Sequence, residues 1–295
     1  MSAGADHAPA ALAHRPLFDG ISSLLMRFPA PELPGLAELD ALYAETTAGA
    51  DVRRLRFVPP VEGAAYEAHI ARHDAVPTRP ADWHDFFNAL AWCVWPRTKS
   101  ICNRLHLQAI EANAAAGLSG RGPLRDALTQ FDECGVLVVG CDAEILHLLA
   151  AHEWEEALWT RRSRLVESTR FLVFGHATWD QLRAPFSGLC AKAIYRQVDV
   201  VWFALPAAQR QAEADAWLAD HLAGSAAELA PRTLRPLPLL GIPGVTPASE
   251  SADYYRDLRQ FRPLAQEERG RDRHADASPP LARRMGLDSE FSSRK

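Results

Sequence analysis

The spacing of apolar residues is helical through most of this chain. In residues 35–46, Leu36, Leu39, Leu42 and Tyr43 recur every three or four positions, which predicts a short amphipathic helix. Similar patterns predict further helices over 142–164, 176–183, 188–204 and 207–223. Helices therefore account for most of the predicted structure.

Two short apolar runs instead have the character of strands. They cover 136–140 and 170–174 and are rich in β-branched and aromatic residues. A glycine-rich turn begins at 119, and we expect a short helical turn over 124–131 and a tight turn over 132–135 before the first strand. The predicted fold class is α+β, a predominantly helical single core with a small β-sheet.

A pair of helices around Pro96 carries the most informative pattern. Asp82 is a suitable N-cap for a helix that continues to about Trp95. Proline cannot continue the hydrogen-bond ladder of that helix, but it suits the first turn of the next, predicted over 97–115 and stopped by Gly117.

The first of these helices is apolar on nearly every side, so we expect it to be buried. Its polar residues are then exceptions that share a face, namely His84, Asp85 and Asn88. The second helix offers Lys99, Asn103 and His106 at similar spacing. Each buried polar group without a partner costs about 1–3 kcal/mol, so these residues need one another, a metal or a ligand.

Imidazole and carboxylate groups of the right types for a divalent metal occur near these helices. The candidate ligands are His84, His106, Asp132 and His176, and the candidate acid/base residues are Asp85 and Glu133. His176 directly follows a predicted strand, where many sites lie. A hairpin turn at 132–133 and structural histidines are the alternative interpretation.

A second set of polar residues predicts a site for an anionic substrate. Its members are Arg79, Asn88, Arg97, Lys99, Asn103, Arg121 and Arg125. Solvated surface arginines are the alternative. The sequence does not match the G-x-x-x-x-G-K-[ST] phosphate loop, which disfavours a nucleotide triphosphate site of that kind.

Composition limits the partners and the compartment. A net charge of −5 gives no general attraction for nucleic acid. Five cysteines without a C-x-x-C pair indicate no disulfide framework, and neither a secretory signal nor a membrane-spanning run is visible. We expect a soluble cytoplasmic protein with a loose N-terminus at 1–14, one globular domain at 15–264 and a disordered charged tail at 265–295.

Several blocks resemble the bacterial domain of unknown function family 3025. They are TRPADWHDFFNALAWCVWPRTKSICNRLH (78–106), GRGPLRDALTQFDECGV (120–136), VFGHA (173–177), and PLPLLGIPG with the later YYRD and FRP (236–263). The resemblance covers roughly 15–264 and departs from the family pattern at GIPGVTP, where an aromatic residue often follows the second glycine. It implies family membership and no particular reaction, cofactor or catalytic residue.

The sharpest functional hypothesis is a metal-assisted hydrolase acting on an anionic substrate, with a divalent ion as its cofactor. Under a second hypothesis, the same polar residues form a structural network in a non-catalytic ligand- or protein-binding module. A third, weaker one is a nucleic-acid-associated protein that uses the arginine cluster. Stoichiometric metal favours the first hypothesis. Replacement of His84 or His106 by alanine should abolish metal binding under the first and mainly lower stability under the second, and a steep salt dependence of nucleic-acid binding favours the third.

Overall fold

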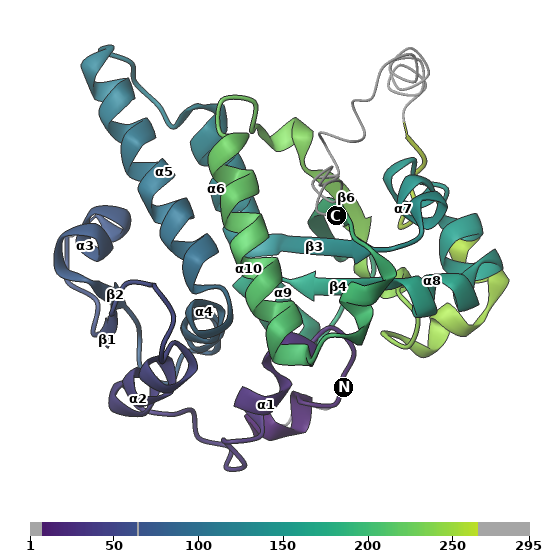
Figure 1. The fold of residues 1–295 in the computed structure, drawn as a ribbon, viewed down its shortest axis with the longest axis horizontal. Helices are drawn as coiled ribbons and strands as arrows, with labels where there is room; N and C mark the ends of the chain where they lie inside the picture. Colours follow the sequence, from purple (N-terminus) through teal and green to yellow (C-terminus); the bar gives the residue numbers. More distant parts are fainter. Residues whose placement is uncertain (1–7, 64, 265–295) are drawn as a thin grey trace, which may run out of the picture. The chain divides into compact units, whose positions relative to one another are not determined.

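The computed structural model describes residues 8–63 and 65–264 (Figure 1). The charged tail expected at 265–295 lies outside the described residues. The chain forms two compact units, of which the first comprises Met1–Gly135, Val173–Ala184 and Pro206–Leu234, and the second the remainder. Within the described residues, no helix is long and apolar enough to cross a lipid bilayer.

Helices build most of the first unit. They are α1 (Ser22–Leu25), α2 (Leu36–Thr46), α3 (Tyr66–His73), α4 (Trp83–Val94), α5 (Pro96–Ala115), α6 (Gly122–Cys134), α9 (His176–Arg183) and α10 (Ala207–Gly224). Short 3-10 helices lie at Pro9–Leu12, Asp19–Ile21 and Pro231–Thr233. Two short parallel strands, β1 (Arg56–Val58) and β2 (Ala75–Pro77), pair through Phe57 and Val76.

A four-stranded sheet, in the order β4-β3-β5-β6, dominates the second unit. Its strands are β3 (Gly135–Gly140), β4 (Thr169–Val173), β5 (Cys190–Gln197) and β6 (Arg235–Pro238), of which β5 and β6 are antiparallel. The helices of this unit are α7 (Ala143–Ala150), a π-helix (Glu156–Thr160), α8 (Arg162–Ser168), and 3-10 turns at Val200–Ala204, Leu239–Gly241, Pro247–Glu250 and Ala252–Arg256. The predicted class, α+β and mainly helical, is confirmed.

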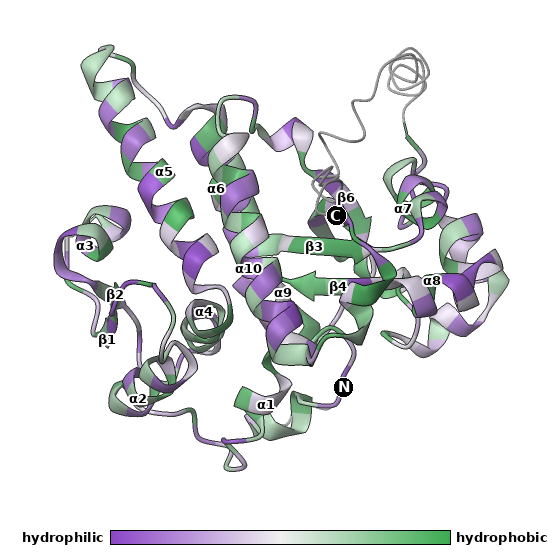
Figure 2. Cartoon of the chain, in the orientation of Figure 1, coloured by the Kyte–Doolittle hydropathy of each residue, from purple (hydrophilic) through white to green (hydrophobic). Residues whose placement is uncertain are grey.

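The helix pair around Pro96 agrees with its prediction. The Asp82 carboxylate accepts a hydrogen bond from the Asp85 N–H at 3.0 Å and so caps α4, which is buried along most of its length. In contrast, hydrophilic and apolar bands alternate along α5 (Figure 2). Tryptophans anchor this part of the core, because Trp95 Nε1 donates to the carbonyl of Val173 and Trp179 Nε1 to that of Leu17.

A residue from α10 completes the start of α5. The N-cap residue Trp95 gives that helix no side-chain cap, and the buried Asp215 carboxylate accepts from the N–H groups of Arg97 and Thr98 at 3.0 and 2.9 Å. The Thr98 hydroxyl also donates to Asp215 at 2.7 Å. These bonds satisfy free N–H groups of the first turn and fix the position of α5 against α10.

Several local predictions were wrong. Residues 132–135 form no turn, because α6 is a helix of 13 residues that continues to Cys134 and leads directly into β3. The helix predicted over 188–204 is instead β5 followed by a 3-10 turn, since Ala191, Ala193 and Tyr195 follow a period of two that the apolar run around them obscured.

Two further segments differ from their predictions. The helix expected over 142–164 is interrupted after Ala150, where His152 has φ +59°, and continues as the π-helix and α8. The segment expected to be loose at 1–14 contains the 3-10 helix Pro9–Leu12, which is anchored by burial of Leu12. Both differences come from packing that local propensity does not encode.

Candidate metal centre

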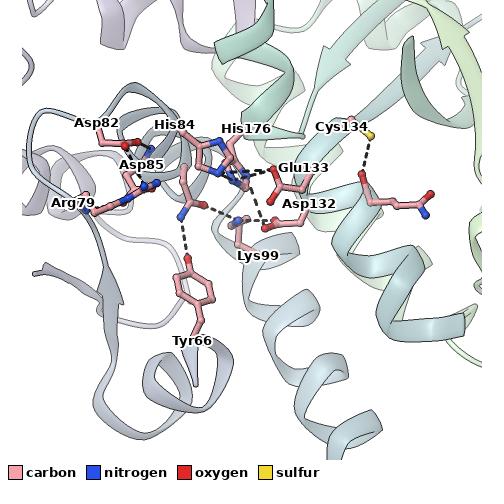
Figure 3. A network of polar contacts seen from close by, with 12 residues as sticks. Tyr66, Arg79, Asp82, His84, Asp85, Lys99, Asp132, Glu133, Cys134 and His176 are labelled. Atoms are coloured by element: carbon pink, nitrogen blue, oxygen red, sulfur yellow. Dashed lines mark hydrogen bonds and ion pairs between the residues drawn. The ribbon is translucent and has the colours of Figure 1, made fainter. Parts of the chain in front are cut away.

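Three helix ends of the first unit meet at one point. His84 lies in the first turn of α4, Glu133 in the last turn of α6, and His176 is the first residue of α9. Figure 3 shows the two imidazole rings directed at one another with the Glu133 carboxylate beside them. The site therefore combines residues that are 92 positions apart in the sequence.

A glycine permits this convergence. A Cβ atom on Gly175 would lie 2.4 Å from the Gly135 nitrogen and 2.5 Å from the Cys134 Cα, so no larger residue fits without displacement. The N–H groups of Phe174 and Gly175 both donate to the Gly135 carbonyl, at 2.9 and 2.8 Å. These contacts hold the start of α9 against the end of α6 and bring His176 to Glu133.

The donor atoms are spaced as metal ligands are. His84 Nε2 and His176 Nε2 are 3.0 Å apart, and Glu133 Oε2 lies 3.8 Å from the first and 3.7 Å from the second. One ligand atom from each residue lies within 4.8 Å of the other two. Two nitrogens bound to one tetrahedral zinc ion are about 3.3 Å apart, so small side-chain shifts suffice for coordination.

The group is buried on one side and open on the other. The His176 side chain is 5% exposed, whereas those of His84 and Glu133 are 34% and 43% exposed. An ion held by these three residues would keep a coordination position that solvent or a substrate can reach. Structural zinc sites have four protein ligands, and catalytic sites have three and a water.

Burial also sets the protonation states. It lowers the pKa of His176 to about 3, against the opposing charge of Asp132, so this imidazole is neutral at pH 7 and able to bind a metal. Burial raises the pKa of Glu133, while the His84 charge lowers it and that of Asp132 raises it further. A divalent ion would favour the ionised carboxylate and offset this cost.

A second carboxylate, that of Asp132, lies near the other ring nitrogen of His176. Asp132 Oδ2 lies 3.8 Å from His176 Nδ1, and Asp132 Oδ1 accepts from Lys99 Nζ at 2.5 Å. Burial acts to raise the pKa of Asp132, but the charge and hydrogen bond of Lys99 outweigh it, and the pKa lies below its ordinary value. Asp132 is thus an ionised group near the other ring nitrogen of His176, which is buried and makes no hydrogen bond with the described residues.

The lysine connects this centre to further polar groups. Lys99 Nζ also donates to Asn88 Oδ1 at 2.9 Å, and Asn88 Nδ2 donates to the Tyr66 hydroxyl at 2.9 Å (Figure 3). The ammonium lies 5.4 Å from the centre of the Trp92 ring. Lys99 is 3% exposed, so these partners together compensate its burial.

Comparison with known proteins supplies the family. The family model described as protein of unknown function (DUF3025) matches residues 55–265. The chain belongs to the DUF3025 family. No curated protein and no solved structure matches it significantly. The DUF3025 match includes every residue of the candidate centre and confirms the resemblance noted in the sequence.

Asp85 and Arg79, both predicted to take part in chemistry, instead contact one another in the DUF3025 fold. Asp85 accepts from the Arg79 backbone N–H at 2.6 Å and from its guanidinium at 2.8 and 3.0 Å. Burial acts to raise the pKa of Asp85, but these bonds outweigh it and lower the pKa. Asp85 is thus paired with Arg79 and does not belong to the three-residue group.

His106 and Asn103 belong to a separate cluster on α5. His106 Nε2 lies 3.9 Å from Glu67 Oε1, and Asn103 Nδ2 donates to Glu67 Oε2 at 2.5 Å. Burial lowers the pKa of His106 to about 4. The structure therefore brings His84 and His176 together and leaves the third predicted histidine with Glu67.

The predicted cationic residues have different partners. Arg97 is exposed and donates its backbone N–H to Asp215, while Arg121 forms an exposed ion pair with Asp126 at 3.2 Å. Arg79 and Lys99 are neutralised by the carboxylates named above. Arg125 forms no hydrogen bond or ion pair with the described residues, and its Nε is buried.

Sequence reasoning missed Tyr66, Glu67 and Gly175 in this DUF3025 protein. No helix was predicted over 66–73, so the first two had no assigned position. Gly175 carried a usable signal, since a glycine between a strand and a helix often allows close backbone approach.

Proposed function

We propose that this protein is a metal-dependent hydrolase in which His84, Glu133 and His176 bind one divalent ion. The observation that supports it is the convergence of two imidazole nitrogens and one carboxylate oxygen within 4.8 Å. Each comes from a different helix, so the arrangement depends on tertiary packing rather than on the regular spacing of one surface. Two histidines and one carboxylate are a ligand set of catalytic zinc sites.

Zinc is the ion that we expect. Three protein ligands leave a fourth tetrahedral position for water, and bound zinc lowers the pKa of that water to about 7. An ion held by these residues would activate a water molecule for attack on an electrophilic carbon or phosphorus atom. The bond from that atom to the leaving group would break, and the proton of the water would pass to the leaving group. The same ligand set also suits non-haem iron(II), so the metal titration described below includes both ions.

Two neighbouring carboxylates take different roles in this proposal. Glu133 is a ligand rather than an acid/base residue, since its Oε2 lies 3.8 and 3.7 Å from the two Nε2 atoms. Asp132 would orient His176 on metal binding, because it is the carboxylate 3.8 Å from Nδ1 and a small side-chain shift would bring the two groups into hydrogen-bond distance. Carboxylate–histidine–metal arrangements of this kind fix the tautomer and raise the basicity of the ligand.

A structural network is the second candidate function, and one observation favours it. The 3.0 Å separation of the two Nε2 atoms also fits a single hydrogen bond between neutral imidazoles. Under that alternative, the histidines stabilise the junction of α4 and α9 without a metal. The two proposals differ in metal stoichiometry.

The test is metal binding by the full-length, untagged chain. After chelation and reloading with zinc or iron(II), mass spectrometry of the metal should give one ion per chain. His84→Ala and Glu133→Gln should each lower zinc affinity at least 100-fold in a competition titration. His73→Ala, which removes an exposed histidine of α3, is the matched control and should leave the affinity unchanged.

Hydrolysis is tested on the same preparations. p-Nitrophenyl acetate and bis(p-nitrophenyl) phosphate report attack at carbon and at phosphorus. Activity that requires the metal and is lost in Glu133→Gln supports the hydrolase. A chain that binds no ion after reloading contradicts the metal centre, and the structural network would then stand.

A further inference from the structure

Helices α5 and α6 form an antiparallel hairpin with a defined register. Lys99 at the start of α5 contacts Asp132 at the end of α6, and Asn113 near the end of α5 donates to the Gly120 carbonyl just before α6. The two helices are therefore adjacent along their length and run in opposite directions. Figure 1 shows the connection that joins them at one end.

This register brings a second pair of residues face to face. His106 follows Lys99 by seven residues along α5, and Arg125 precedes Asp132 by seven residues along α6. Seven residues are nearly two helical turns, or about 10.5 Å, so His106 and Arg125 share the face of the Lys99–Asp132 pair. The second pair lies towards the end of the hairpin at which α5 and α6 are connected.

Both residues of the second pair have a buried nitrogen without an acceptor or donor. His106 is 4% exposed and its Nδ1 has no hydrogen-bond partner, and neither has the buried Nε of Arg125. A guanidinium is always charged and its Nε–H can only donate. A buried donor without a partner is costly, which is a reason to expect an acceptor from outside the chain.

The charges around the pair favour an anion. Arg125 has no carboxylate partner among the described residues, whereas Lys99 is paired with Asp132. Glu67, the nearest carboxylate to His106, already accepts a hydrogen bond from Asn103. Arg125 acts on Glu67 only through its charge, which lowers the pKa of that carboxyl, and its N–H groups remain available to a ligand.

We propose that Arg125 and His106 bind an oxyanion group of the substrate, a phosphate or a carboxylate, two helical turns from the Lys99–Asp132 pair. Arg125 donates through Nε and a terminal nitrogen, in the fork geometry that suits such groups, and His106 donates through Nδ1 in the tautomer protonated there. The inference rests on the proposed hydrolase for the word substrate, and it extends the substrate away from the metal.

The experiment measures binding of inorganic phosphate and of acetate to the full-length chain by calorimetry, both zinc-loaded and after chelation. We expect saturable 1:1 binding of at least one anion that persists without zinc. Arg125→Gln should weaken it at least tenfold and His106→Gln about threefold. Arg104→Gln, which removes an exposed arginine of α5, is the matched control and should bind as the wild type does.

The outcomes separate this site from the metal centre. Absence of binding of either anion, or equal affinity in Arg125→Gln, overturns the proposal, and so does binding that disappears with the zinc. Zinc stoichiometry, measured on the same samples, is expected to be unchanged in Arg125→Gln, so failure of the metal centre would be visible separately. If Arg125→Gln does not fold, Arg125→Lys replaces it, and an unchanged anion affinity there overturns the proposal equally.

Discussion

Two clusters of the first unit contain a histidine and a glutamate from different helices, yet they differ in what they can bind. At the His84–Glu133–His176 centre, three helix ends bring three donor atoms within 4.8 Å. At the Glu67–Asn103–His106 cluster, one imidazole faces one carboxylate at 3.9 Å, and an amide occupies the other carboxylate oxygen. The number of converging donors, rather than residue type or burial, separates a metal site from a polar contact.

The largest expected effect is a difference in zinc binding between two variants, one in each cluster. His176→Gln should abolish stoichiometric zinc binding because it removes the most buried ligand, whereas His106→Gln should retain one zinc ion per chain. Metal analysis after dialysis measures both. Retention of zinc in His176→Gln, or its loss in a folded His106→Gln, would contradict the assignment of the metal site to the His84–Glu133–His176 centre.

Lys99 supports the His84–Glu133–His176 centre through its contact with Asp132. Lys99→Met keeps most of the side-chain volume but leaves the Asp132 charge without its partner, which we expect to lower the free energy of unfolding by about 3 kcal/mol. Zinc affinity should fall 10- to 100-fold because Asp132 no longer holds His176 in place. Urea unfolding and a competition titration report the two effects.

A compensating substitution provides the control for Lys99→Met. In the Lys99→Met/Asp132→Asn double variant, the uncompensated charge is removed, so much of the lost stability should return while the zinc affinity stays low. Full recovery of zinc affinity in the double variant would show that Asp132 does not orient His176.

Patterns of neighbouring residues were sufficient to predict α4 and α5, but not the candidate metal centre. The Asp82 cap and Pro96 mark helix boundaries that depend on neighbouring residues only, and the structure agrees with both. Asp132 and Glu133 were assigned to a turn because aspartate and glycine are common there, although packing of Phe131 extends α6 to Cys134. The contact between His84 and His176 spans 92 residues and depends on Gly175, so no local pattern encodes it.

Gly175 tests that explanation with a smaller effect. Gly175→Ala places a Cβ 2.4–2.5 Å from backbone atoms of Cys134 and Gly135, and we expect a loss of about 2 kcal/mol of unfolding free energy. Zinc affinity should fall as well, since the start of α9 must move. Gly224→Ala, where nothing lies within 4 Å, is the control and should be neutral or slightly stabilising.

The smallest expected effect concerns pH and the second cluster. Burial lowers the pKa of His106 to about 4, so between pH 6.5 and 4 the unfolded chain binds a proton at this residue that the folded chain does not. Stability must therefore decrease as the pH falls through this window. His106→Gln should reduce the loss between pH 8 and 5.5 by roughly 1 kcal/mol, measured by urea unfolding with a chelator present.

An unchanged pH dependence in His106→Gln would mean that His106 is protonated in the folded chain. His106 would then differ from His176, whose pKa is lowered by burial.

X-ray absorption spectroscopy at the zinc edge of the reloaded full-length chain identifies the atoms bound to the ion, and so tests whether His84, Glu133 and His176 are its ligands. We expect a four-coordinate ion with two imidazole nitrogens and two oxygens at about 2.0–2.2 Å, and one imidazole fewer in His84→Ala. A first shell containing sulfur at about 2.3 Å, or one without imidazole, would contradict it.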